Sequence, residues 1–268
     1  MKFKQVYSSP NSAGLTDVGQ QREINEDGFV IDEQSGLYLV ADGMGGHRNG
    51  AVASQLFLFE LSRLIGELKL RLGTLDTHAK EKGNQEEQYL TLSEWLANSV
   101  STANAILYQR NQREGSRKGA GMGTAIAGIW KPDNSSNGAI LFHVGDCRIY
   151  LYRRNRLSQL TKDHTLYQRW LDNNRSGIEP SKNIIVKAIG PYPDVTAELS
   201  IHHFEPGDTI LICSDGLTNM LNDSHMREAI NNHKQRPLMS LCETLIEDAN
   251  EAGGIDNITV VVSRVGEE

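Results

Sequence analysis

Short apolar runs joined by hairpin-length polar segments restrict the fold of this chain more than any other feature. Residues 29–31 and 37–41 are apolar and flank a polar stretch at 32–36, which is the pattern of a β-hairpin. Further strands are predicted at 124–130, 138–144, 148–153, 183–190, 197–205, 208–216 and 257–265. Because these runs do not alternate with helices, the pattern predicts an α+β fold of antiparallel sheets with segregated helices.

Apolar residues at helical spacing predict three helices, at 46–68, 90–113 and 223–251, the last of them broken near Pro237. The polar stretch 67–90 is interpreted as a solvated insertion or as extended helix ends, and 160–182 as a loop-rich region. No linker, repeat or low-complexity block divides the chain. Residues 1–268 are therefore predicted to form one domain.

Two aspartates bracket the predicted hairpin. Its midpoint falls between Gln34 and Ser35, and Asp27 and Asp42 are equally far from this midpoint along the sequence. In an in-register hairpin the two aspartates are cross-strand neighbours, with Cβ atoms about 4.5–5.5 Å apart. Two carboxylates at that distance repel each other, and a divalent cation between them removes the repulsion.

Three more aspartates occupy the ends of predicted strands or the turn between two strands: Asp146, Asp215 and Asp256. A single Asp-Gly pair is a common turn dipeptide, but this recurrence predicts that the side chains converge on one rim. Ligands that are all carboxylates suit Mg²⁺ or Mn²⁺ rather than Zn²⁺ or copper. Two such ions about 3.5–4 Å apart can share a bridging hydroxide and hold a phosphoryl group. Asp42 is placed to bridge them, with the Gly43 carbonyl beside it.

Around these aspartates the sequence resembles a known enzyme family. Residues 22–27 (REINED) and 40–47 (VADGMGGH) look like the opening motifs of the metal-dependent type 2C protein phosphatases, and the second is similar to the bacterial branch. Shorter matches follow in the expected order at 121–124, 144–148, 160–164, 214–217 and 256–259. Together the matches span nearly the whole chain.

The resemblance implies an αββα sandwich, in which two antiparallel β-sheets pack together with helices outside and metal ions at one rim. It implies a protein serine/threonine phosphatase that hydrolyses phosphoserine and phosphothreonine by a metal-bridged water, without a phosphoenzyme. The implied cofactors are two core Mn²⁺ or Mg²⁺ ions and a third, weaker ion. Residues 160–190 resemble the family's flap, a segment that often touches substrate.

The resemblance also assigns roles by position. Arg22 matches the residue that grips the phosphate, a task that suits a bidentate guanidinium, and the implied catalytic residues are Arg22, Asp27 and Asp42. The implied metal ligands are Glu26, Asp27, Asp42, Gly43, Asp146, Asp215 and Asp256. Among these, Asp215 and Asp256 complete the first metal. Glu26 and Asp27 support the second, partly through waters, and Asp146, together with Asp215, resembles the ligands of the third.

Several positions depart from the family pattern. Some members have a histidine directly after the Asp-Gly as the proposed general acid, whereas this chain has Met44, and His47 lies three residues further on. Protonation of the leaving group is then expected to fall to a metal-bound water. Cys147 replaces the usual serine, which suggests a packing change, and Lys187 stands where the flap often has arginine. His164 is expected on the surface.

Other activities fit the sequence less well. Cys147 and Arg153 have the Cys-x5-Arg spacing of cysteine phosphatases, but the alternating strand between them contains no glycine and cannot form the N–H cradle. The eight histidines show no grouping typical of binuclear His/Asp phosphoesterases. Residues 119–123 (GAGMG) match neither a dinucleotide fingerprint nor a P-loop. The alternative that stays open is a catalytically weak, phosphopeptide-binding or scaffolding member of the same fold.

Composition limits the partners. Lys and Arg number 27 and Asp and Glu number 34, a net charge of −7 that argues against nucleic acid or an anionic membrane as partner. No apolar run reaches the ~18–20 residues of a membrane helix. The N-terminal segment lacks the apolar stretch of a secretory signal, and three scattered cysteines suggest a reducing compartment, so a cytoplasmic location is expected. The expected partner is a phosphorylated protein, opposing a serine/threonine kinase, and the expected state is a monomer.

Overall fold

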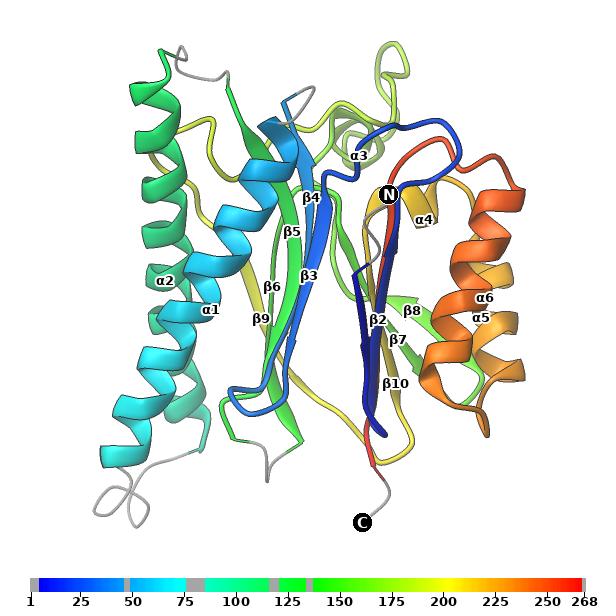
Figure 1. Ribbon diagram of the computed structural model, residues 1–268, viewed down its shortest axis with the longest axis horizontal. Coiled ribbons are helices and arrows are strands. Elements are labelled where there is room, and N and C mark those ends of the chain that lie inside the picture. Colours follow the sequence, from blue (N-terminus) through cyan, green and yellow to red (C-terminus); the bar gives the residue numbers. More distant parts are fainter. Residues whose placement is uncertain (1–4, 46–48, 76–84, 116–120, 134–136, 267–268) are drawn as a thin grey trace.

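Two antiparallel β-sheets pack face to face, and helices cover both outer faces (Figure 1). The computed structural model describes residues 5–45, 49–75, 85–115, 121–133 and 137–266. This arrangement confirms the predicted α+β class and the αββα sandwich that the family resemblance implies.

The first sheet contains the aspartate hairpin and has the order β3-β4-β5-β6-β9, with all neighbours antiparallel. Its strands are β3 (Asp27–Asp32), β4 (Leu37–Met44), β5 (Gly123–Trp130), β6 (Gly138–Val144) and β9 (Glu198–His203). Asp27 pairs with Asp42 and Asp32 pairs with Leu37. The register deduced from the midpoint of the hairpin is therefore confirmed.

The second sheet has the order β1-β2-β11-β10-β7-β8. Its strands are β1 (Val6–Ser8), β2 (Ser12–Asp17), β7 (Arg148–Arg153), β8 (Arg156–Gln159), β10 (Thr209–Cys213) and β11 (Ile258–Arg264). The sequence analysis missed β1, β2 and β8. These strands are short or rich in small and polar residues, and pairing with their neighbours holds them in the sheet.

The long helices α1 (Asn49–Leu75) and α2 (Gln85–Arg113) cover the first sheet, and three helices cover the second: α4 (Asp215–Thr218), α5 (Asp223–Asn232) and α6 (Leu238–Glu251) (Figure 1). The end of α5 and the start of α6 confirm the break predicted near Pro237. The described parts of 67–90 are extended helix ends, and residues 76–84 lie outside the described residues. Among the described helices, none is both long and apolar enough to cross a membrane.

Alternation along the strands explains the layers. In β5, Ala125, Ala127 and Ile129 face the second sheet, whereas Ile126 and Trp130 face α1 and α2. In β10 the same period of two sends one set of side chains between the sheets and the other toward α5 and α6. Strands buried on both faces read as continuous apolar runs, which is why they were recognisable in the sequence.

The segment between β8 and β9 differs from its prediction. Residues 183–190, predicted as a strand, form only isolated bridges, between Ile185 and Thr165 and between Ile189 and Thr124. The region 160–182, predicted as loop-rich, contains the short helix α3 (Leu166–Asp172). The backbone groups of this segment form hydrogen bonds with several separate partners rather than along one strand. The strand prediction for 183–190, which was based on apolar character alone, was therefore wrong.

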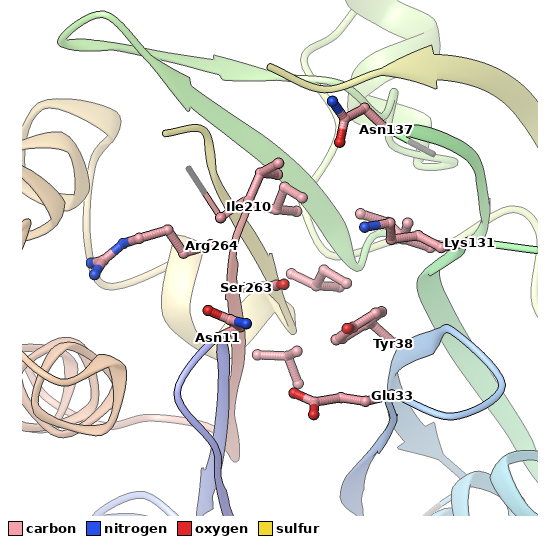
Figure 2. Close-up of a pocket in the computed structure, with 13 residues that line it drawn as sticks. Asn11, Glu33, Tyr38, Lys131, Asn137, Ile210, Ser263 and Arg264 are labelled. Carbon is pink, nitrogen blue, oxygen red and sulfur yellow. The ribbon is translucent and has the colours of Figure 1, made fainter. Parts of the chain in front are cut away.

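The end of the sandwich opposite Asp42 holds a cavity of about 410 Å³ between the two sheets (Figure 2). Apolar side chains of both sheets, among them Ile129 and Ile210, line it together with Tyr38. Its polar lining includes Glu33, Lys131, Ser263, Arg264 and two asparagines. Charges of both signs therefore meet at this end.

Candidate active site

Asp27 and Asp42 lie side by side at one end of the β3–β4 hairpin. The Asp27 side chain is buried, and its Oδ2 accepts hydrogen bonds of 2.7 Å from the hydroxyls of Ser214 and Thr259. Ser214 follows β10 and Thr259 lies in β11, so both belong to the second sheet. Asp27 therefore links the two sheets at the rim that carries the aspartates.

Backbone segments approach one another closely beside this pair, and Gly43 permits the approach. Its N–H donates to the Glu26 carbonyl at 3.2 Å, and a Cβ at this position would collide with the Gly50 carbonyl. The Glu26 carboxylate accepts the Gly50 N–H at 2.9 Å, at the start of α1, where the helix dipole favours a negative charge. Glu26, Gly43 and the first turn of α1 thus form one fixed unit next to Asp42.

Asp146, Asp215 and Asp256 reach the same rim from other elements. Asp215 begins α4, one residue beyond Ser214, which follows β10. Asp146 lies in the turn between β6 and β7, and Asp256 precedes β11. Within the described residues, Asp146 Oδ1 and Asp215 Oδ1 are buried without a hydrogen-bond partner. Unpartnered buried carboxylate oxygens are costly, and an all-oxygen donor set suits a hard divalent cation. The residues present therefore fit the metal ions that the family resemblance implies.

Burial and mutual repulsion raise the pKa values of four of the aspartates: Asp27, Asp42, Asp146 and Asp215. Burial raises the pKa of Asp27 to about 7, against its two hydroxyl hydrogen bonds, and the charge of Asp215 adds to the rise. Burial and the charge of Asp215 likewise raise the pKa of Asp146 to about 7. Burial, followed by the charge of Asp27, holds the pKa of Asp42 well above its ordinary value. The carboxyls form one electrostatic cluster, which a bound cation would return to the ionised state.

Arg22 lies at the exposed edge of the cluster. Its Nη2 donates to Asp256 Oδ2 at 2.8 Å, and about half of its side chain is exposed. An ion pair this exposed contributes little to stability. The guanidinium donors that Asp256 does not use suit an incoming phosphate, since the side chain is half exposed.

Three supporting residues were not assigned roles from the sequence: Ser214, Asn257 and Thr259. Asn257 Oδ1 accepts the Glu26 N–H at 2.8 Å, and its Nδ2 donates to the Val18 and Ile24 carbonyls at 3.0 Å each. Their positions in the sequence could have indicated these roles, because each of the three lies within three residues of an aspartate at a strand end. The hydrogen-bond partners, however, come from distant parts of the chain.

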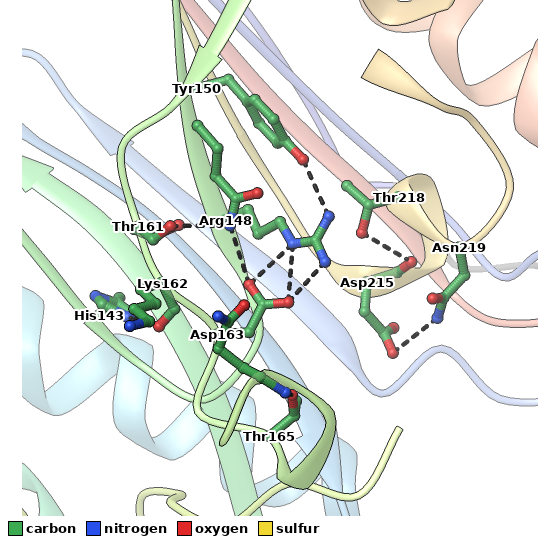
Figure 3. A network of polar contacts seen from close by, with 12 residues as sticks. His143, Arg148, Tyr150, Thr161, Lys162, Asp163, Thr165, Asp215, Thr218 and Asn219 are labelled. Atoms are coloured by element: carbon green, nitrogen blue, oxygen red, sulfur yellow. Dashed lines mark hydrogen bonds and ion pairs between the residues drawn. The ribbon is translucent and has the colours of Figure 1, made fainter. Parts of the chain in front are cut away.

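The segment 160–190 is tied to the rim by an ion pair (Figure 3). Arg148 Nε and Nη2 donate to the two Asp163 carboxylate oxygens at 2.9 and 2.6 Å, and Nη1 donates to the Tyr150 hydroxyl at 3.1 Å. Arg148 begins β7 two residues after Asp146. The ion pair therefore holds the start of this segment beside the Asp146 turn.

Next to Asp163, the ligand atoms of His143, His164 and Glu198 lie within 4.8 Å of one another. His164, expected on the surface, has a side chain only 15% exposed, because it stacks on His143 and its Nδ1 accepts the Gly145 N–H at 3.0 Å. The two rings are nearly parallel, at 6°, so one ion cannot lie in the planes of both. The contacts indicate that this cluster supports the turn that carries Asp146.

The structure locates three of the four positions that depart from the family pattern. Met44 ends β4 and packs against the core between the sheets, and Cys147 is buried in that core as a free cysteine. Lys187 lines a pocket together with His164 and Arg169. His47 lies outside the described residues.

Known proteins are similar to this chain over nearly its whole length. Residues 19–246 match the family model of protein phosphatase 2C. The chain is 36% identical over 262 residues to the protein phosphatase PhpP of Streptococcus pneumoniae, covering 95% of this chain and 97% of the relative. It is 33% identical over 257 residues to the serine/threonine phosphatase stp of Listeria monocytogenes, covering 92% of each.

Solved structures give the same result. The catalytic domain of the serine/threonine protein phosphatase PstP, in complex with two manganese ions, matches with a TM-score of 0.76 at 32% identity. The match covers 96% of this chain and 98% of that one. The chain is therefore a phosphoprotein phosphatase and belongs to the protein phosphatase 2C family.

Proposed function

We propose that the protein removes phosphate from phosphoserine and phosphothreonine in a metal-dependent reaction at the aspartate rim, without a phosphoenzyme. The observation that carries the proposal is the pair of buried, unpartnered oxygens, Asp146 Oδ1 and Asp215 Oδ1, within a cluster of like charges. A cluster of this kind destabilises the fold unless cations neutralise it. The relatives named as phosphatases support the same chemistry.

The proposed ligands of two core Mn²⁺ or Mg²⁺ ions are the carboxylates of Asp27, Asp42, Asp215 and Asp256, the Gly43 carbonyl, and Glu26. Asp42, as the cross-strand neighbour of Asp27, is the proposed bridge between the two ions. Asp146 is proposed as a ligand of a third, weaker ion. When bound, the ions supply an activated water and positive charge for the phosphoryl oxygens.

The side chains of this protein provide the remaining functions. Arg22 binds the phosphate oxygens with the donors that Asp256 does not use. Ser214 and Thr259 favour the ionised form of Asp27, against the effect of burial, and orient its carboxylate through their hydrogen bonds. Met44 has no acidic proton to donate, so protonation of the leaving group is assigned to water at the site.

The family relationship also supports several proposals about context. The substrate is a phosphorylated protein, the opposing enzyme is a serine/threonine kinase, and the chain acts as one monomeric catalytic domain. Three buried free cysteines support a reducing compartment such as the cytoplasm. The alternative of a phosphopeptide-binding or scaffolding module has no support among the relatives, which are named as phosphatases.

The proposal is tested by hydrolysis of p-nitrophenyl phosphate and of phosphothreonine and phosphotyrosine peptides, with Mn²⁺, with Mg²⁺ and with EDTA. Turnover that requires a divalent ion and favours phosphothreonine over phosphotyrosine is expected. Undiminished turnover in EDTA, or a folded protein inactive with both ions, would contradict the proposal.

A further inference from the structure

Helix α1 carries a second apolar stripe, which the core covers only in part. Ala53, Phe57 and Leu61 are fully buried against the first sheet. Val52, Leu56 and Phe59 follow the spacing i, i+4, i+7 on a different face of the helix, and Phe59 is 64% exposed. Val52 and Leu56 are partly buried at the edge of the same core, so the exposed Phe59 is the member of this stripe that core packing does not use.

The second stripe forms one wall of an open groove of about 680 Å³, named here the α1 groove. Its lining residues are Ile24, Ala51, Val52, Gln55, Leu56, Phe59 and Arg110. Ile24, on the loop before β3, is 39% exposed, and Arg110 of α2 contributes the single charged side chain of the lining. The groove therefore suits an apolar side chain attached to a polar backbone.

The α1 groove is continuous with the proposed active site. Ile24 lies two residues after Arg22 and two before Glu26, and its carbonyl is held by Asn257. On the other wall, the Glu26 carboxylate accepts the Gly50 N–H, and the Glu26 carbonyl accepts the Ser54 hydroxyl at 2.6 Å. Both walls are thus fixed to Glu26, and α1 starts where β4 ends (Figure 1).

We propose that the α1 groove binds an apolar side chain of the phosphoprotein substrate, on one side of the phosphorylated residue. This inference rests on the proposed function, because a phosphate held by Arg22 places the substrate chain beside Ile24. Arg22 and Ile24 are two residues apart, so their Cα atoms are separated by at most about 7 Å. The side chain in the groove therefore belongs to a residue a few positions from the phosphorylated one, and substrates with leucine or a similar residue there are preferred.

The test uses phosphothreonine peptides of one length, in which a leucine takes each flanking position in turn within an alanine and serine background. At one or two neighbouring positions on the same side, leucine should raise kcat/KM about tenfold over serine. Phe59→Ala should reduce this preference to about twofold or less and leave hydrolysis of p-nitrophenyl phosphate unchanged, since that substrate cannot reach the groove. Because Phe59 is mostly exposed, its truncation removes little buried area.

Leu70→Ala is the matched control, because Leu70 is 74% exposed on the same helix but lies about 16 Å further along it. This variant should keep the leucine preference of the wild type. Equal kcat/KM for leucine and serine at every position would overturn the inference, as would a change of association state in Phe59→Ala without any change in peptide preference. Failure of the proposed function is distinct, because it would abolish metal-dependent hydrolysis of p-nitrophenyl phosphate in every variant.

Discussion

The two ends of the sandwich are built from the same strands but differ in the charges that they bring together. Among the described residues, the far end leaves a neutral hydroxyl, Ser12 Oγ, buried without a hydrogen-bond partner, whereas the rim leaves carboxylate oxygens in that state. At the far end, Glu33 accepts a 2.6 Å hydrogen bond from Ser9, and the cavity lining holds charges of both signs (Figure 2). At the rim, aspartates of like charge gather, and Asp146 and Asp215 each leave a buried oxygen unpartnered. Stability alone would favour the first arrangement at both ends. We infer from this difference that the residues of the rim serve ligand binding rather than stability.

The largest effect is expected for Asp42→Asn. Loss of hydrogen-bonding partners behind metal ligands costs about 10–100-fold, so loss of the proposed bridging ligand should lower kcat/KM by at least about 100-fold. Glu33→Gln, at the far end, also removes one carboxylate charge, and its kcat/KM should stay within about twofold of the wild-type value. Phosphatase assays and circular dichroism on both variants check this comparison. A folded Asp42→Asn enzyme with more than a tenth of wild-type activity would remove the special role of the rim.

Arg22→Ala is expected to act mainly on substrate binding. Hydrogen bonds to charged groups contribute about 1.5–3 kcal/mol, so KM should rise about 10–100-fold while kcat changes little. Arg22→Lys keeps the charge without the bidentate geometry, so its KM should lie between those of the wild type and Arg22→Ala. Steady-state kinetics on a phosphopeptide separates these cases. A defect confined to kcat would assign Arg22 to the chemical step instead.

Asp146→Asn should have a smaller effect, because its proposed ion is the weakest of the three. Activity toward phosphopeptides should fall about tenfold, with a higher Mn²⁺ concentration for half-maximal rate. Isothermal titration should find the two stronger sites still present and the weakest one lost. If metal stoichiometry and activity both matched the wild type, Asp146 would have no part in metal binding.

The smallest expected effect is on stability and follows from the raised pKa values. Asp27 and Asp146 have folded-state pKa values of about 7, above the ordinary value of 3.8. As pH rises from about 4 to 7, the unfolded chain releases protons that the folded state retains. The free energy of unfolding therefore decreases over that interval. In EDTA, the melting temperature should fall by a few degrees between pH 5 and pH 8, and the increase produced by Mn²⁺ should grow over the same range.

Asp27→Asn provides the control for this effect. It removes one of the titrating groups and should flatten the dependence of melting temperature on pH in EDTA. Differential scanning fluorimetry on both proteins measures the slopes. A metal-free wild-type protein that becomes more stable from pH 5 to pH 8 would show that the carboxyls do not repel one another as described.

The sequence predicted the rim better than it predicted the segment beside it. The register of Asp27 and Asp42 follows from local symmetry of one hairpin, and buried strands such as β5 and β10 are visible as apolar runs. The conformation of 183–190 depends instead on single contacts with distant residues such as Thr124, which no local pattern reports. The supporting roles of Asn257 and Thr259 were hidden for the same reason, since their partners lie more than 200 residues away in sequence.

The central claim is that carboxylates from distant parts of the chain gather to hold two hard cations. Anomalous diffraction from crystals soaked in Mn²⁺ tests it directly. Two strong peaks are expected among Asp27, Asp42, Asp215 and Asp256, with Asp42 in contact with both. Crystals saturated with Mn²⁺ that show no anomalous density at this rim would contradict the claim.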